Sequence, residues 1–201
     1  MKVLFAASEC VPFVKTGGLA DVVGALSKAL VRQGVDARVI LPLYREIPQT
    51  YREQMEHCLY FYVNLGWRRQ YVGIEKLELG GVTFYFVDNL QYFDRPYIYG
   101  SGGDEGERFS YFCRAVMEAM PQIDFVPDIL HCHDWQTGMI PALLEAIAAA
   151  LPPDRRRVTL LLPFSKGGLA ERCRREGAVE SEAFTADGVR MTVTLGVRML
   201  D

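Results

Sequence analysis

The chain has 201 residues and a formal net charge of −3, and half of its residues are hydrophobic. This size suits one α/β domain or one domain with a small appendage, and the charge gives no sign of an overall nucleic-acid-binding surface. No stretch approaches the roughly 18 to 20 apolar residues that span a bilayer, and no cleavage pattern follows the amino terminus, so we expect a cytosolic protein. Five cysteines without Cys-x-x-Cys spacing disfavour a disulfide framework and a structural zinc site.

The amino-terminal part of the chain has the pattern of a β-α-β unit. Residues 2–8 predict a buried strand, residues 18–33 an amphipathic helix and residues 37–43 the next, parallel strand. Gly24, in the middle of the helix, predicts close packing against a neighbouring segment, and Gly34 predicts the carboxyl-terminal cap. This unit begins a doubly wound sheet.

An antiparallel excursion follows on the same sheet. Residues 58–64, 70–79 and 82–87 alternate or cluster apolar and aromatic side chains, and Gly80-Gly81 predicts a two-residue hairpin turn between the last two segments.

The next elements return the chain to an α/β pattern. We expect a loop from Asn89 to Gly106, a helix over about 106–120, a short strand within 127–135, and a helix over about 137–150. The fold class is therefore α/β, Rossmann-like and doubly wound, with a mostly parallel sheet.

The remaining residues predict a small α+β tail. Its expected elements are a strand, a helix and a β-ribbon turned by Asp187-Gly188, over residues 157–162, 168–176, 178–184 and 189–195. The continuously apolar run 158–162 predicts a parallel strand beside residues 128–132, reached through the helix over 137–150.

Residues 15–21 (KTGGLAD) lie between the first strand and the first helix. Adjacent glycines let a ligand approach the backbone, the first helix amides point toward it, and Lys15 adds a positive charge. The loop therefore predicts a site for a phosphorylated ligand, with a tight turn and a solvated lysine as the alternative. It matches neither Gly-x-x-x-x-Gly-Lys-Ser/Thr nor Gly-x-Gly-x-x-Gly.

Ligands of open α/β sheets bind at the carboxyl ends of the strands. We expect Glu9, residues 15–21 (the glycine loop) and residues 133–136 to meet there. Trp135 beside Asp134 suits a sugar ring, with core packing as the alternative. His131 and His133 share one face of a strand, but a zinc site would need a third ligand, which the sequence alone does not locate, so zinc binding is the minor alternative.

The tail carries more positive than negative charge. From Pro152 onward there are nine Lys and Arg against seven Asp and Glu, a net of +2. The arginines fit either a polyanion-binding surface or a solvated face. Residues 163–170 (PFSKGGLA) echo residues 12–20, and either a second phosphate loop or chance similarity explains this.

Four stretches of the chain, in order, resemble the N-terminal domain of bacterial glycogen synthase and plant starch synthase, of glycosyltransferase family 5: residues 7–22, 93–96, 107–109 and 131–136. The resemblance covers residues 1–142. It implies a two-Rossmann-domain enzyme that transfers glucose from ADP-glucose to an α-1,4-glucan with retention of configuration, without a further cofactor or a bound metal.

The same resemblance assigns roles by position. Lys15 and the amides of Gly17 and Gly18 would contact the phosphates of the donor, with Asp21 in the same pocket. The sugar and acceptor cleft would be lined by Glu9, Tyr99, Asp134, Trp135 and Gln136. ADP-glucose or ADP and an α-1,4-glucan are the implied partners, and a nucleic acid is not expected.

The resemblance ends near Leu143, and residues 143–201 resemble the carboxyl-terminal end of an HflX-type GTPase. We therefore expect two parts, 1–142 and 143–201, joined as a chimera within the helix over 137–150. The cations that stabilise the departing diphosphate in the family are missing, so we expect this chain alone to be inactive. The alternatives are a non-catalytic chimeric or designed fold, and a ribosome- or RNA-binding module that uses the basic tail.

Overall fold

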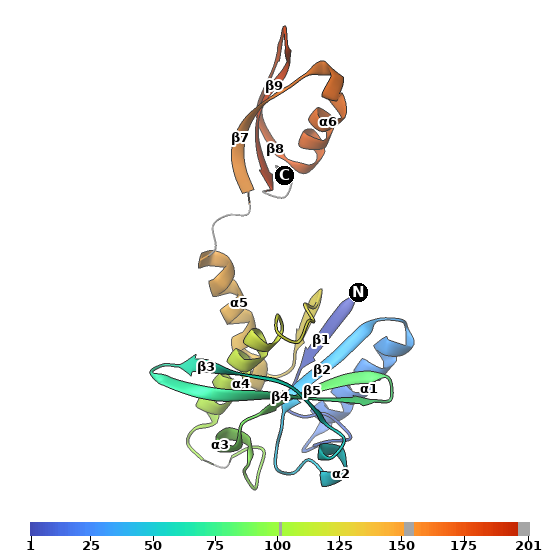
Figure 1. Cartoon of the computed structure of the whole chain (residues 1–201), viewed down its shortest axis with the longest axis vertical. Helices are drawn as coiled ribbons and strands as arrows, with labels where there is room; N and C mark the ends of the chain where they lie inside the picture. The colour runs from blue at the N-terminus through green and yellow to red at the C-terminus, as the bar shows by residue number, and fades with distance from the viewer. Residues whose placement is uncertain (101, 151–154, 197–201) are drawn as a thin grey trace. The chain divides into compact units, whose positions relative to one another are not determined.

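The computed structural model describes residues 1–100, 102–150 and 155–196. Ser101 of the expected loop, and residues 151–154 and 197–201 of the expected tail, lie outside the described residues. The chain forms two compact units, Met1–Leu144 and Glu145–Asp201 (Figure 1).

The first unit is built on a six-stranded sheet with the order β3-β4-β5-β2-β1-β6. The last four strands in this order are parallel to one another, and β3 and β4 extend the sheet in antiparallel pairing. The predicted fold class is confirmed. The strands are β1 (Lys2–Ala6), β2 (Asp36–Pro42), β3 (Glu56–Leu65), β4 (Arg68–Leu79), β5 (Val82–Asp88) and β6 (Ile129–Cys132).

Two longer helices pack on this sheet, α1 (Gly18–Arg32) and α4 (Glu105–Ala119), whereas α5 (Met139–Ala150) begins in the first unit and continues past its end at Leu144. Helix α1 packs against β2 and β5, and α4 packs against β3 and β5. Three short elements were not predicted from sequence: α2 (Gln49–Arg52), α3 (Leu90–Phe93) and a 3₁₀ turn (Trp135–Thr137). In the described part of the chain, no helix has the length and apolar character needed to cross a membrane.

The glycine predictions in this unit are confirmed. A Cβ at Gly24 would lie 2.4 Å from Val11 Cγ2 and 2.9 Å from Val11 O, so glycine lets α1 approach the loop after β1. Gly34 has a φ of +82° and closes α1, because its N–H donates to Val31 O while the next N–H donates to Leu30 O. Gly80 and Gly81, with φ of +61° and +81°, form the turn between β4 and β5.

The second unit contains a separate three-stranded sheet in the order β7-β9-β8, with α6 (Gly167–Glu176). Its strands are β7 (Arg155–Leu162), β8 (Ala178–Thr185) and β9 (Gly188–Gly196). The predicted strand, helix and ribbon are all present, although the turn residues are Ala186 and Asp187 rather than Asp187-Gly188.

The prediction that residues 158–162 join the large sheet beside residues 128–132 is wrong. β7 pairs antiparallel with β9, from Arg155 opposite Gly196 to Leu162 opposite Val189. The apolar run is not buried on both faces. Alternate residues Val158, Leu160 and Leu162 pack on the small core with α6 and β9, whereas Leu161 is 48% exposed.

Candidate functional site

The glycine loop leaves the start of α1 open. Gly17 caps the helix without a side-chain hydrogen bond, and a Cβ at Gly17 or Gly18 would meet no atom within 4 Å. Gly17 has a φ of −148°, which any residue adopts, so neither internal packing nor backbone conformation demands glycine here. The two residues are exposed, and the unpaired amides at a helix start attract an anion.

Lys15 lies beside this helix start and is paired with Asp21. Lys15 Nζ lies 2.8 Å from Asp21 Oδ1 and 2.7 Å from Asp21 Oδ2, and about half of each side chain is exposed. Ion pairs this exposed contribute at most about 1 kcal/mol. An anionic ligand therefore competes with Asp21 for Lys15 at little energetic cost.

Glu9 holds the glycine loop through hydrogen bonds to its carboxylate. Its side chain is buried, and its Oε2 accepts hydrogen bonds from Thr16 N–H at 2.5 Å, Thr16 Oγ1 at 3.0 Å and Gly17 N–H at 3.4 Å. Its Oε1 accepts one from the Tyr99 hydroxyl at 3.2 Å, and Tyr99 is also 2.7 Å from Ser8 Oγ. Glu9 thus positions the glycine loop relative to Tyr99, a role that sequence reasoning missed because it depends on burial.

Glu9, the glycine loop and residues 133–136, which were predicted to meet at the carboxyl edge of the sheet, do lie together. β1 and β6 are adjacent and parallel, with Ala6 opposite Cys132, and His133 N–H donates to Ala6 O at 3.0 Å. An aromatic series connects the loops, because the Phe109 ring lies 6.1 Å from Tyr99 and 5.2 Å from Trp135 between centroids.

The loop after β6 combines an exposed aromatic ring with an acidic residue whose backbone is strained. Trp135 is 55% exposed. Asp134 has a φ of +63° and accepts a hydrogen bond from Trp135 N–H at 2.7 Å. Such a conformation costs a non-glycine residue about 1 to 3 kcal/mol and is concentrated at functional sites. Gln136, which was predicted to line the sugar and acceptor cleft, is buried, and its Oε1 has no hydrogen-bond partner among the described residues.

His133 is neutral in this environment. Burial, together with the adjacent His131, lowers the pKa of His133 to about 4. The two imidazole centroids are 4.3 Å apart. Within the part of the chain that the structure describes, no three His, Cys, Asp or Glu side chains are arranged to hold a metal ion.

Four arginines in the described part of the tail are paired with carboxylates of the same unit. Arg157 pairs with Glu180 and Arg174 with Glu182, and Glu176 receives both Arg172 and Arg175. These pairs are largely exposed and two of the arginines share Glu176, so the pairs do not remove the net positive charge of the tail, and RNA binding remains an alternative.

The echo of the glycine loop in the tail is incomplete. Gly167 and Gly168 at the start of α6 are as open as Gly17 and Gly18. However, Thr16 has no counterpart in the tail loop, and Leu160 occupies the position that corresponds to Glu9, while Glu171 corresponds to Asp21. The tail loop therefore lacks the buried carboxylate that holds the first loop.

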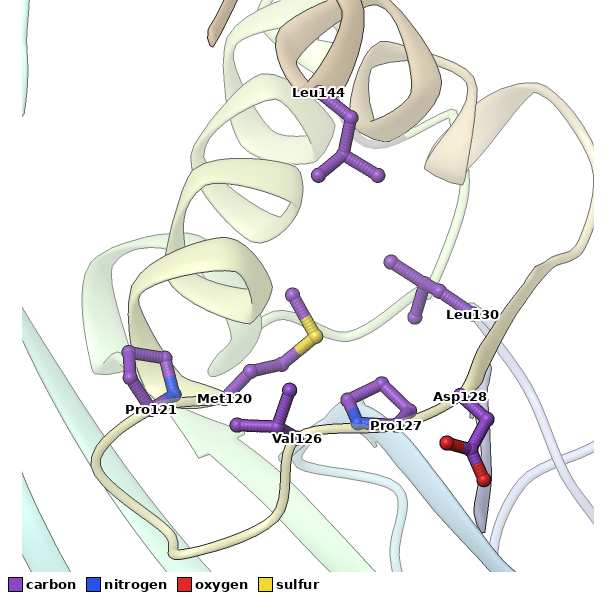
Figure 2. Close-up of a pocket in the computed structure, with 7 residues that line it drawn as sticks. All are labelled: Met120, Pro121, Val126, Pro127, Asp128, Leu130 and Leu144. Carbon is purple, nitrogen blue, oxygen red and sulfur yellow. The ribbon is translucent and has the colours of Figure 1, made fainter. Parts of the chain in front are cut away.

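An apolar cavity of about 400 Å³ lies at the other end of β6, where the chain enters this strand (Figure 2). Asp128 is its one charged residue, and Figure 2 shows the carboxylate turned away from the apolar side chains. No predicted site residue contributes to this cavity, which is lined by Met120, Pro121, Val126, Pro127, Asp128, Leu130 and Leu144.

Fold and site together define an α/β domain with an open, anion-attracting helix start at the carboxyl edge of a mostly parallel sheet. The sequence matches the family described as "Starch synthase catalytic domain" over residues 2–174. The chain belongs to this family. The match extends past Leu143, so the predicted chimeric junction and the GTPase-like tail receive no support from it.

Named relatives agree with the family. Over 145 residues the chain is 62% identical to a glycogen synthase of Anoxybacillus flavithermus, and over 161 residues it is 54% identical to a glycogen synthase of Caldicellulosiruptor saccharolyticus. These matches cover 72% and 80% of this chain, and 30% and 34% of the relatives, so the chain spans about a third of their length.

A solved structure shows the same fold. The catalytic domain of starch synthase IV from Arabidopsis thaliana, bound to ADP and acarbose, superposes with a TM-score of 0.60 at 32% identity. The match covers 74% of this chain and 30% of that chain.

Proposed function

We propose that this chain is the donor-binding part of an ADP-glucose-dependent α-1,4-glucan synthase, a glycogen or starch synthase. The observation that carries the proposal is the open Gly17-Gly18 helix start with Lys15 beside it, held in place by the buried Glu9. The glycogen synthase relatives and the starch synthase structure bound to ADP support it.

In this proposal the diphosphate of ADP-glucose lies at the start of α1. The Gly18 N–H and the Lys15 ammonium contact phosphate oxygens, and the Gly17 N–H joins them by giving up its 3.4 Å hydrogen bond to Glu9 Oε2. Asp21 releases Lys15 when the ligand binds. Trp135 offers a ring face to the glucosyl unit or the acceptor glucan, with Asp134 and Tyr99 nearby as hydrogen-bonding groups. No further cofactor takes part.

Binding of ADP to the full 201-residue chain tests the donor site directly. A charge-assisted contact to phosphate contributes roughly 1.5 to 3 kcal/mol, or about ten- to a hundredfold in affinity. We expect weak binding, on the order of millimolar, that is lost in Lys15→Ala. Lys166→Ala, in the echo of this loop, is the matched control and should bind ADP like the unchanged chain. Equal binding by Lys15→Ala and the unchanged chain in calorimetry would contradict the assignment.

We further propose that the 201-residue polypeptide alone transfers no measurable glucose. Loss of a single preorganised group that stabilises developing charge commonly reduces the rate about 10²- to 10³-fold, and the Arg/Lys pair that the resemblance implies for the pyrophosphate, in addition to Lys15, is not recognised among these residues. Incorporation of labelled glucose into glycogen would measure this, with the full-length Anoxybacillus flavithermus glycogen synthase as positive control. Turnover comparable to that enzyme would refute the proposal.

A further inference from the structure

The β3–β4 hairpin carries three tyrosines on one exposed face. Tyr60, Tyr62 and Tyr71 are 63%, 45% and 36% exposed. The strand register places Tyr62 opposite Tyr71 and Tyr60 opposite Gly73, so the three side chains lie on the same face of the sheet. The alternate residues Phe61 and Val63 belong to the hydrophobic core, so this tyrosine face is the solvent side of the hairpin.

The rings form an ordered cluster. Tyr60 and Tyr71 are nearly parallel, with centroids 6.2 Å apart and an interplanar angle of 23°. Tyr62 is close to perpendicular to Tyr71, at 6.0 Å and 77°. The Arg69 guanidinium lies 4.3 Å from the Tyr62 ring centre and fixes this ring from one side.

The structure also determines the orientation of Tyr71. A Cβ at Gly73 would lie 2.7 Å from the Tyr71 hydroxyl and 3.3 Å from Tyr71 Cε1, so the ring extends over Gly73. The Tyr71 carbonyl accepts hydrogen bonds from Asn89 Nδ2 at 2.8 Å and from the Tyr111 hydroxyl at 2.6 Å. Both the backbone and the ring position are therefore set without a ligand.

Carboxylates continue the same face beyond the rings. Asp88 on β5 pairs with Gly73, and its Cβ would lie 3.2 Å from a Cβ at that glycine. Glu75 lies two residues after Gly73, and its Oε1 is 2.7 Å from His57 Nδ1, at hydrogen-bond distance. Acceptors at the end of an aromatic row match a ligand with apolar faces and hydroxyl groups along its edges.

We propose that Tyr60, Tyr62 and Tyr71 form a surface site that binds an α-glucan chain, separate from the donor site at the start of α1. A pyranose presents C–H groups on its faces, which pack on aromatic rings, and hydroxyl groups on its rim, which donate to carboxylates. Within the described stretch 60–73, the other exposed side chains of this face are the polar Asn64 and Arg69, whose amide and guanidinium groups can hydrogen-bond to hydroxyl groups of a glucan. The choice of α-glucan among polysaccharides rests on the proposed function.

Affinity electrophoresis of the full chain in native gels tests this site. Gels contain glycogen, cellulose-type soluble β-glucan, or no polysaccharide. We expect retardation by glycogen and not by the β-glucan. Tyr60→Ala combined with Tyr71→Ala should weaken glycogen binding roughly tenfold or more. Phe184→Ala is the matched control, because Phe184 is a 75% exposed aromatic side chain on β8 of the second unit and is not part of the hairpin.

Gly73→Ala provides a second variant that removes no aromatic group. Its Cβ would displace the Tyr71 ring, so we expect weakened retardation with a melting temperature close to that of the unchanged chain. Melting curves for every variant separate loss of the site from loss of the fold.

Several outcomes would overturn the proposal: no retardation of the folded chain by glycogen, equal retardation of the double tyrosine variant, or loss of binding only in Phe184→Ala. Gel filtration that shows a dimer dissociated by the tyrosine substitutions would instead assign the face to self-association. ADP titration of the same samples keeps the two proposals distinct, since a failed donor site removes ADP binding and a failed tyrosine face does not.

Discussion

Glu9 is predicted to determine the geometry of the glycine loop, and Glu9→Ala tests this. The truncation removes the acceptor for Thr16 N–H, for the Thr16 hydroxyl and for Tyr99. Tyr99 still has Ser8 as a partner, and exposed Thr16 can donate its hydroxyl to water. The main loss is the charge-assisted bond from Thr16 N–H, about 1.5 to 3 kcal/mol, with a small cavity added. We expect the free energy of unfolding to fall by about 2 to 4 kcal/mol.

Urea unfolding followed by tryptophan fluorescence measures this change in the first unit alone, because both tryptophans, Trp67 and Trp135, lie within Met1–Leu144. With a slope of about 2 kcal/mol/M, the unfolding midpoint should decrease by about 1 to 2 M. The released loop should also lose its preorganised amides, so ADP affinity should fall about tenfold.

Two further variants sharpen the test. Glu9→Gln keeps one acceptor oxygen but loses the charge, and we expect about half of the effect of Glu9→Ala. Glu46→Gln, at an exposed position of the same unit, should change neither the midpoint nor ADP binding. The reasoning fails if Glu9→Ala unfolds at the same urea concentration as the unchanged chain, because the loop would then be held by other contacts.

Three other predictions follow from the described geometry. Gly24→Ala should destabilise the first unit by about 1 to 3 kcal/mol in urea unfolding, because its Cβ would overlap Val11. An unchanged midpoint would show that the loop around Val11 moves aside without loss of stability. Gly34→Ala should cost about 1 kcal/mol by the same measurement, since its φ of +82° disfavours a side chain, and a gain in stability would contradict this. His133 has a pKa lowered to about 4, so its contribution to stability is present above pH 6.5 and is lost as the pH falls from 6.5 to about 4. That difference corresponds to about 3 kcal/mol at most, and about 1 to 2 kcal/mol for a partly accessible ring; melting temperatures of His133→Asn should therefore depend less on pH over this range than those of the unchanged chain.

Local signals in the sequence were sufficient for most elements of the fold. The turn at Gly80-Gly81 and the cap at Gly34 depend on local backbone conformation. Helix α1 depends on the spacing of nearby apolar residues, so all three can be predicted from a short stretch of sequence. The meeting of Glu9, the glycine loop and Trp135 at one rim also followed, because parallel strands end at a common edge.

Strand pairing between distant segments was decided by the tertiary structure. An apolar run such as residues 158–162 can pair with several partners, and the sequence does not show whether one face or both will be buried. In the structure β9 is the partner, and only the alternate residues of β7 pack on the small core with α6 and β9.

Burial and register likewise gave several side chains their roles. Glu9 was predicted to line a cleft, but its burial beneath Thr16 makes it a support for the loop. Tyr60, Tyr62 and Tyr71 form one face only through the register of β3 on β4 and the space over Gly73. Such effects depend on contacts between residues far apart in the chain, so the sequence determined the elements and the family, and the tertiary structure decided which side chains meet.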